Sequence, residues 1–418
     1  MSDEPADLRL SASPGFSSAP VHQDPQYRRL WTVGILVGLI RWVEILAFAV
    51  FTYERTHSEL WVASLMTLRM LPLALFGVSL GALAARVSRR MAMLAMHVSV
   101  SLVSLVLLLL SWSGQIEVWH LAAASFLGGV LWASDMPLRR GQLGDIAGPG
   151  RVAQAMSLDS VASSGCRLFG PMVGGVLLAQ GGLTAVFSCS VLLYLPALYA
   201  LWRLREPRST LQMSGGSLLA VLAGGLQAAR ESPQLRAVLW LTILFNLFGW
   251  PVMSMVPVIG RDLLHLDPQG VGLLAGLDGV GAVLGSLLLS LGVARMPHGR
   301  LYLGSVVSFM VVQMLLAWSS LLLLTAVALL ALGAAQTAFG VMQATLAYTA
   351  GPAHRRAQAM GLMTMCIGAS PLGFMGVGAL AERMGAPAAT LVCGVCGLVS
   401  VALTWPLCRA CLRESAVG

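Results

Sequence analysis

Long apolar runs separated by short polar segments fill the chain from residue 30 to residue 408. A helix of about 18 to 25 mostly apolar residues can cross a hydrocarbon core roughly 30 Å thick, and it satisfies its own backbone hydrogen bonds, as lipid requires. We therefore predict an all-α membrane protein whose twelve transmembrane helices cover residues 30–52, 60–83, 91–112, 117–137, 156–179, 184–203, 236–258, 270–293, 301–318, 321–347, 358–381 and 388–408.

One polar hinge between two of these runs is nearly repeated later in the chain. The stretch AGPGRVAQAMSL at residues 147–158 returns as AGPAHRRAQAMGL at residues 350–362. Gln154 corresponds to Gln358, a shift of 204 residues, and half of the 418-residue chain is 209. A copy at this distance is typical of a tandem duplication. We expect two related halves.

The pattern divides the chain into five parts. The polar residues before the first run contain no apolar segment that could act as a cleaved signal, so we interpret them as a disordered cytoplasmic tail. Within the linker, the stretch LLAVLAGGLQAARES is amphipathic and suited to a membrane surface. The predicted parts are a tail at 1–29, a six-helix bundle at 30–203, a linker at 204–235, a second six-helix bundle at 236–408 and a tail at 409–418.

Composition agrees with this pattern and excludes a soluble protein. Hydrophobic residues make up 57% and charged residues 11% of the chain, and the mean hydropathy is +0.80. In soluble proteins roughly a quarter of the residues are charged. The chain has no GxSxG, P-loop or HExxH pattern, so we expect neither an enzyme nor a bound cofactor.

Arginine carries the topology signal. All 26 basic residues are Arg, and of the 23 outside the helix interiors only Arg55, Arg261 and Arg383 fall in loops on one side. The other 20 lie on the side of the N-terminus, which predicts that both termini are cytoplasmic. The net charge of +8 therefore reflects topology and requires no nucleic acid. Because avoidance of Lys suggests a GC-rich genome, we expect a bacterial inner membrane.

The seven cysteines do not predict a metal site or a disulfide framework. Five of them fall inside apolar helices, where a free Cys behaves as a small hydrophobic residue. The CGVC stretch at 393–396 has redox spacing but no soluble βαβ context. We expect all seven to be reduced packing residues.

Five charged residues lie deep inside predicted helices, at membrane depth, namely Arg41, Glu44, Arg69, Arg167 and Asp278. A charge at membrane depth is costly and is retained where it faces a bundle interior or a wet cavity. We predict that these five line a substrate cavity. The alternative is that Arg41 and Glu44, which share one helical face, form a self-neutralising pair that only holds helices together.

Two sets of residues mark candidate gating elements around the helix ends. Asp135 lies near Arg139 and Arg140, which predicts an ion-pair cluster at the cytoplasmic end of the fourth helix. The fifth helix carries Gly170, Pro171, Gly174 and Gly175, which favour close helix packing and a kink.

The stretch after the second helix resembles a loop motif of the major facilitator superfamily, G-x-x-x-D-R-x-G-R-R. Four positions match, namely Gly81, Arg86, Arg89 and Arg90. Ala85 and Ser88 depart from the motif. Since the family's Asp helps latch the two halves on the cytoplasmic side, the departure implies a latch that is weaker or differently built here. The Gly-Pro-x-x-Gly-Gly stretch of the fifth helix resembles the motif of the superfamily's exporters.

This resemblance covers residues 30–408 and implies two parallel six-helix repeats that work by alternating access. The sequence looks most like the branch that contains the enterobactin exporter and the macrolide efflux proteins. It implies a monomeric proton antiporter that exports a small amphiphile, with a siderophore as the first expectation and an antibiotic as the second. A non-transporting membrane receptor or scaffold is the alternative from a different class.

Three roles follow for the intramembrane charges. We predict that Glu44 is the proton-coupling carboxylate, because burial disfavours its charge while Arg41 and Arg69 favour it. The three arginines predict a substrate with acidic or hydroxamate-like oxygens. The resemblance places the fifth and eighth helices side by side, so we expect Arg167 and Asp278 to bridge the halves; the alternative is that Arg167 pairs within its own half, for example with Glu44.

Overall fold

The computed structural model describes residues 21–84, 88–148, 151–205, 218–290, 297–317, 321–351 and 355–412, which form helices and no strand. Eleven segments of these ranges are long and apolar enough to span a membrane. One of them, Gln154–Trp202, has 49 residues and would be about 74 Å long as a single helix, more than twice the hydrocarbon thickness. It is broken at Gly181 and Gly182, where φ of Gly182 is 60°. This segment therefore crosses twice, which agrees with the twelve predicted crossings.

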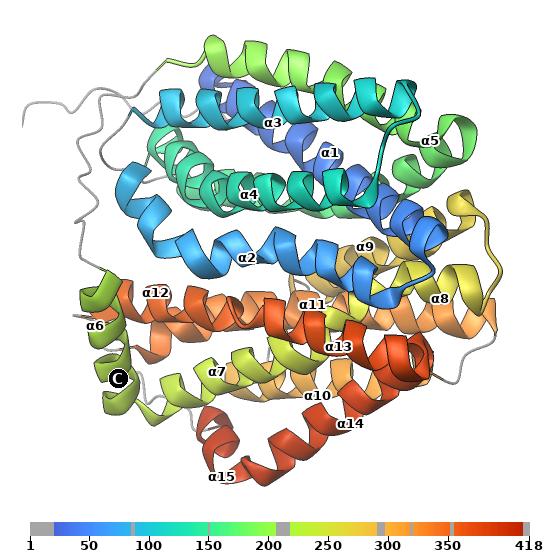
Figure 1. The fold of residues 1–418 in the computed structure, drawn as a ribbon. Coiled ribbons are helices and arrows are strands. Elements are labelled where there is room, and N and C mark those ends of the chain that lie inside the picture. Colours follow the sequence, from blue (N-terminus) through green and yellow to red (C-terminus); the bar gives the residue numbers. More distant parts are fainter. Residues whose placement is uncertain are drawn as a thin grey trace, which may run out of the picture.

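The first half of the chain forms one bundle (Figure 1). The two arms of α5 pack against α1 and α3, while α2 packs against α4. The elements are the 3-10 helix η1 (Val21–Gln23), α1 (Pro25–Thr56), α2 (Glu59–Ala84), α3 (Arg89–Trp112), α4 (Val118–Ala147) and α5 (Val152–Trp202).

The second half forms the other bundle and contains two interrupted crossings. The first changes from α-helix to a π-helical turn and then a 3-10 turn, and the second breaks between α12 and α13. The elements are α6 (Leu218–Glu231), α7 (Pro233–Leu244), η2 (Phe245–Gly249), η3 (Trp250–Met255), α8 (Val256–Asp262), α9 (Pro268–Ser290), α10 (His298–Leu316), α11 (Leu322–Ala350), α12 (Arg356–Ile367), α13 (Ser370–Met384), α14 (Ala386–Leu403), α15 (Trp405–Cys408) and η6 (Arg409–Leu412).

Several helix ends differ from the predicted ends for local reasons. The Asp24 side chain accepts hydrogen bonds from the backbone N–H groups of Gln26 and Tyr27, so α1 begins before residue 30. Within the predicted disordered tail, residues 21–23 and 25–29 are helical, so that part of the prediction is wrong. The predicted polar hinge after residue 137 is also helical, because α4 continues to Ala147.

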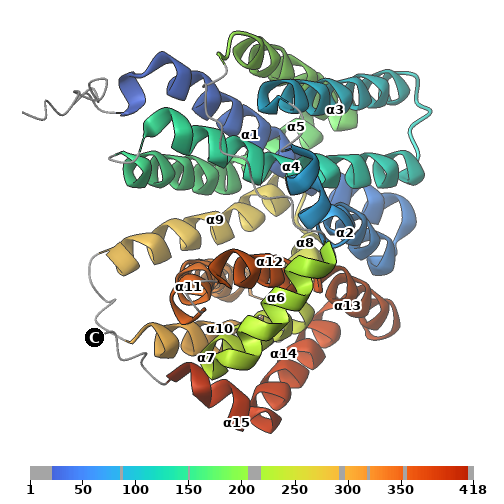
Figure 2. The ribbon, with the colours of Figure 1, turned by 90° about the vertical axis from the view of Figure 1, so that its left-hand side faces the viewer.

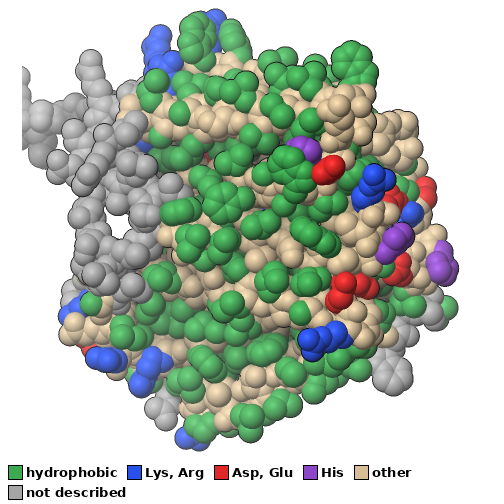
Figure 3. Space-filling model, in the orientation of Figure 1, with side chains coloured by type: hydrophobic (Ala, Val, Ile, Leu, Met, Phe, Trp, Pro, Cys, Tyr) green, Lys and Arg blue, Asp and Glu red, His purple; other side chains and the backbone are tan. Residues whose placement is uncertain are grey.

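The two ends of the helices define two sides of the molecule. The start of α1, α6 and α15 lie on one side, which we call the linker side, and the turns after α1 and α8 lie on the opposite, far side (Figures 1 and 2). Hydrophobic side chains cover most of the surface between the two sides, and charged side chains gather at its edges (Figure 3). The pattern is that of a protein surrounded by lipid.

The halves meet mainly where α5 packs against α9 and α2 against α13. A Cβ atom placed on Gly175 of α5 would lie 2.6 Å from the Pro268 carbonyl oxygen and 2.9 Å from the Gly272 Cα of α9. Gly174 instead faces α1, where a Cβ would lie 2.9 Å from the Val43 carbonyl oxygen, and Gly170 faces Trp42 of α1. Small residues therefore permit close approach both within the first half and between the halves.

The repeated hinge has the same structural role in both halves. Ala155 and Ala359 are fully buried at equivalent positions. In the first half, Gln154 accepts a hydrogen bond of 3.3 Å from the N–H of Val21 in η1. In the second half, α6 packs on the hinge, and a Cβ on its Gly224 would lie 2.8 Å from Gln358. Each hinge thus receives the segment that precedes its own bundle.

Candidate functional site

Two of the pockets between the halves adjoin Arg167. The linker-side pocket, of about 450 Å³, is lined by Arg140, Ser160, Ser163, Ser164 and Arg167 of the first half and by Phe245, Asn246, Trp250, Gln336, Thr337, Phe339, Gly340, Val341, Gln343 and Ile367 of the second. The central pocket, of about 90 Å³, is lined by Trp42, Ile45, Leu46, Ala49, Val62, Met66, Trp132, Arg167, Pro171, Trp250, Met253, Ser254, Val256, Pro257, Ala275, Asp278 and Leu329.

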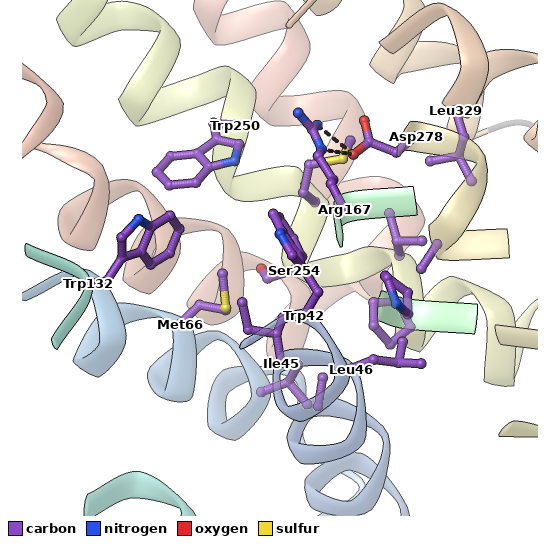
Figure 4. Close-up of a pocket in the computed structure, with 17 residues that line it drawn as sticks. Trp42, Ile45, Leu46, Met66, Trp132, Arg167, Trp250, Ser254, Asp278 and Leu329 are labelled. Atoms are coloured by element: carbon purple, nitrogen blue, oxygen red, sulfur yellow. Dashed lines mark hydrogen bonds and ion pairs between the residues drawn. The ribbon is translucent and has the colours of Figure 1, made fainter. Parts of the chain in front are cut away.

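The central pocket is mostly apolar and rich in tryptophan (Figure 4). Trp42 and Trp132 come from the first half and Trp250 from the second, and they surround the space together with aliphatic and Met side chains. The only charged residues that line it are Arg167 and Asp278. A lining of this kind suits an apolar group with few polar atoms.

Arg167 and Asp278 form the predicted bridge between the halves. Arg167 Nη2 lies 2.5 Å from Asp278 Oδ2, and Arg167 Nε donates to the same oxygen at 2.6 Å. Arg167 also donates to the Gln336 side chain of α11 and lies over the Trp42 ring at 5.9 Å. The alternative, a pair between Arg167 and Glu44, does not occur among the residues described here.

This bridge lies at the boundary between the two pockets, because Arg167 and Trp250 line both of them. Asp278 is 8% exposed, and its second carboxylate oxygen, Oδ1, has no partner within the described part of the chain. This oxygen is itself buried.

The first bundle contains the predicted ion-pair cluster on the linker side. Asp135 accepts a hydrogen bond of 3.2 Å from Arg139, whose Nη1 lies 2.5 Å from Asp159. Arg140 pairs with Asp159 at 2.9 Å, and Arg41 lies 3.9 Å from Asp135. Sequence reasoning missed Asp159, although it is the lone acidic residue of its predicted span and thus carried a usable signal.

Arg41 and Glu44 do not form the predicted alternative pair. Arg41 reaches Asp135 and lies over the Trp132 ring at 4.8 Å, whereas Glu44 accepts a hydrogen bond of 3.2 Å from Ser104. Glu44 is 7% exposed. Neither residue is among those that line the two pockets.

Arg69 is also enclosed in the first bundle and outside the two pockets. It is 3% exposed, lies over the Phe48 ring at 5.9 Å and packs against Gly128, which leaves room for its guanidinium group. Its Nη2 atom has no hydrogen-bond partner among the described residues. Of the five charges that we predicted to share a cavity, only Arg167 and Asp278 are brought together at a pocket.

The residues of the loop motif hold helix ends together within the first half. Arg89 pairs with Asp145 at 2.6 Å, and Arg90 donates to the backbone carbonyl of Trp202. Gly81 belongs to the last turns of α2, and Arg86 lies outside the described residues.

Polar contacts between the halves gather at mid-depth and on the far side. Glu54 pairs with Arg261 at 2.5 Å, and Ser58 donates a hydrogen bond of 2.7 Å to Glu382. These contacts join the halves on the far side, and the linker-side pocket lies between the halves toward the other side.

Comparison with known proteins agrees with this arrangement. A family model described as "Transmembrane secretion effector" matches residues 16–416. The chain is 26% identical over 381 residues to the MFS-type transporter YfiS of Bacillus subtilis (strain 168), covering 87% of this chain and 88% of that one. It is 23% identical to the staphyloferrin A transporter of Staphylococcus aureus, covering 61% and 64% of the two chains. It is 22% identical to macrolide efflux protein A of Streptococcus pyogenes, covering 64% and 66%.

Solved transporter structures share the fold. A bacterial homologue of the lysosomal transporter Spinster, inward-facing and occupied, superposes with a TM-score of 0.73 at 15% identity and covers 94% of this chain and 100% of that chain. A bacterial homologue of ferroportin in an inward-facing state gives a TM-score of 0.62 at 16% identity, covering 90% and 98%. Two bundles around a tryptophan-lined pocket, and a family match over almost the whole length, lead to one conclusion: the chain belongs to the transmembrane secretion effector family of major facilitator proteins and is a multi-pass membrane transporter, not an enzyme.

Proposed function

We propose that the protein exports a small amphiphilic molecule from the bacterial cytoplasm by proton antiport, as a monomer with alternating access. The linker side is then the cytoplasmic side of the inner membrane, which the excess of Arg on that side supports. A single chain encloses the central pocket, so one copy supplies the whole site.

The arrangement of the halves supports alternating access. Ion pairs join the halves at mid-depth and on the far side, and the larger pocket lies toward the linker side. This geometry supports a carrier that accepts its substrate from the cytoplasm. Two halves of duplicated origin can rock against each other, and the glycines at the contact between α5 and α9 allow the close approach that such a motion uses.

The lining of the central pocket carries the substrate proposal. The resemblance implied a siderophore, and three arginines in one cavity predicted a substrate with acidic or hydroxamate-like oxygens. Of these arginines only Arg167 lines the pocket, and Asp278 neutralises its charge. Three tryptophans and an ion pair favour a largely apolar molecule with one polar or basic group. We therefore propose macrolide-like drugs as the leading substrate class. A siderophore is the second candidate, favoured by the similarity to a staphyloferrin A transporter.

Glu44 is proposed as the proton-carrying group. Helix α1 presents Trp42, Ile45, Leu46 and Ala49 to the central pocket with helical spacing, and Glu44 lies on the opposite face, inside the bundle. A change in its charge next to the incompletely paired Arg69 would alter packing on one face of the helix that lines the pocket on the other. Proton and substrate sites would then communicate through α1.

A transport assay in vesicles tests the proposal. The purified protein is reconstituted into liposomes, and a radiolabelled macrolide is added. The macrolide should move against its own concentration gradient only when a pH gradient is imposed. A protonophore should stop that movement. If an iron-free siderophore is transported under the same conditions and the macrolide is not, the second candidate is favoured. A protein that moves neither compound while remaining folded would support the receptor alternative.

A further inference from the structure

Two neighbouring residues at the far-side end of α1 face two at the far-side end of α8. Tyr53 and Glu54 lie in the last turn of α1, and Arg261 and Asp262 end α8. Glu54 and Asp262 differ by 208 positions, as do Tyr53 and Arg261, and this shift is close to the 209 residues of half the chain. The four residues thus occupy equivalent places in the two repeats.

The backbone independently confirms this equivalence. His57 follows α1 with φ of 50°, and His265 follows α8 with φ of 52°, again 208 positions apart. They are the only non-glycine residues with positive φ among the described residues. Since a left-handed residue at a helix end is a specific feature, its presence at both places fixes the register between the repeats.

The contacts between the four residues are reciprocal. Glu54 Oε1 of the first repeat lies 2.5 Å from Arg261 Nη2 of the second. In return, the Tyr53 hydroxyl of the first repeat donates a hydrogen bond to Asp262 of the second. Each repeat therefore offers one donor and one carboxylate to the other, as the two sides of a two-fold contact do.

We propose that these four residues form the far-side gate of the transporter, a reciprocal latch with one ionic arm and one neutral arm. The inference rests on the alternating-access part of the proposed function. The arms differ because Tyr53 stands where the second repeat has Arg261, so one carboxylate meets a cation and the other meets a phenol.

The surroundings suit a latch that opens and closes. The side chains of Arg261 and Glu54 are 29% and 36% exposed, and a water-accessible pocket of about 260 Å³ adjoins all four residues, together with the two histidines and Leu266. Parting a partly hydrated ion pair costs little, because water takes the place of each partner. Nearby, Ser58 and the backbone N–H of Leu60 at the start of α2 both donate to Glu382 of α13, which closes the same side.

The difference between the ionic arm and the neutral arm determines how firmly the far side is held closed. A second ionic arm would hold the far side closed more firmly, and loss of either arm would favour opening. Tyr53 is 6% exposed and packs edge-on against His57 at 6.2 Å, so its hydroxyl is held toward Asp262. The phenol thus sets a latch of intermediate strength.

Hydrogen–deuterium exchange of the full-length protein in detergent or nanodiscs tests the latch without any substrate. Glu54→Gln and Tyr53→Phe should each raise exchange of the segments around residues 50–60 and 256–268 by about two- to fivefold, in line with partly exposed polar pairs. Tyr53→Arg should lower it below that of the original protein. Arg55→Gln, a charge change at the exposed neighbouring residue, should leave it unchanged.

A charge exchange guards against general destabilisation. Glu54→Arg combined with Arg261→Glu should bring the hydrogen–deuterium exchange of these segments back toward that of the original protein, whereas each single substitution should raise it. The reciprocal latch is refuted if the double variant shows as much hydrogen–deuterium exchange as the single variants. It is also refuted if Tyr53→Arg raises the exchange as Tyr53→Phe does. Failure of macrolide transport alone would refute the substrate proposal and leave the exchange results unaffected.

Discussion

Arg167 of α5 and Asp278 of α9 form an ion pair of 2.5 Å that joins the two halves at the boundary between the linker-side pocket and the central pocket. The pair is largely enclosed, with side chains 16% and 11% exposed. Buried pairs add little net stability but are costly to break on one side, often about 3 to 5 kcal/mol. An ion pair with these properties can bias the equilibrium between two arrangements of the halves.

Single replacement of either partner should therefore abolish most transport. Arg167→Asp and Asp278→Arg each leave two like charges facing one another, whereas the combined exchange restores an opposite pair. We expect the combined variant to recover part of the transport lost in each single variant, measured as macrolide movement in vesicles. A combined variant as inactive as the single ones would show that the ion pair itself is not what transport requires.

Glu44→Gln should abolish uphill export and leave substrate binding intact. The amide keeps the shape and the contact with Ser104 but cannot carry a proton. Binding measured by tryptophan fluorescence and pH-driven transport measured in vesicles separate the two effects. Glu117→Gln, at an exposed position before α4, is the matched control and should change neither. Full pH-driven transport by Glu44→Gln would remove the assignment.

Trp250→Ala should weaken binding of a macrolide roughly 3- to 10-fold, because an aromatic contact contributes about 0.5 to 1.5 kcal/mol beyond its buried area. Trp250→Phe should retain most of the affinity. Trp112, which is 79% exposed, provides the control, and Trp112→Ala should bind normally. Equilibrium binding of a labelled macrolide measures all three variants, and equal affinity throughout would place the substrate elsewhere.

Gly175→Ala should destabilise the protein and impair transport. Its new Cβ would lie 2.6 Å from the Pro268 carbonyl oxygen, and overpacking of this kind costs about 1 to 3 kcal/mol. Thermal unfolding in detergent reports the loss of stability. Gly304→Ala is the control, since no atom lies within 4 Å of the added methyl group. Equal unfolding temperatures for the two variants would contradict the close approach of α5 and α9.

The fold could be predicted from the sequence because few kinds of structure can cross lipid with their backbone hydrogen bonds satisfied. Long apolar runs predicted the crossings, and the repeated hinge around Gln154 and Gln358 predicted two related halves. The exact ends of the helices were harder to predict from the sequence. The helical start before residue 30 depends on the Asp24 cap, and Val21 of η1 is held by Gln154, more than a hundred positions away.

The site was only partly accessible from sequence. A charge inside a span indicates that it faces protein, but not whether it faces a cavity or the interior of one bundle. Arg69 is enclosed beside Gly128, and Arg41 reaches Asp135, so only Arg167 and Asp278 lie at a pocket. The tryptophans that dominate the pocket look like ordinary apolar positions until the helices are assembled. Trp42 could have been found from its place in the apolar stripe of α1.

Transport by the purified protein tests the central claim most directly. Protein is reconstituted into liposomes in a known orientation, a pH gradient is imposed, and accumulation of a radiolabelled macrolide is followed with and without a protonophore. Alternating access with proton antiport predicts uphill accumulation that collapses with the protonophore and is absent in Glu44→Gln. Accumulation that is equal in the presence and absence of the gradient, or a complete lack of movement by folded protein, would contradict it.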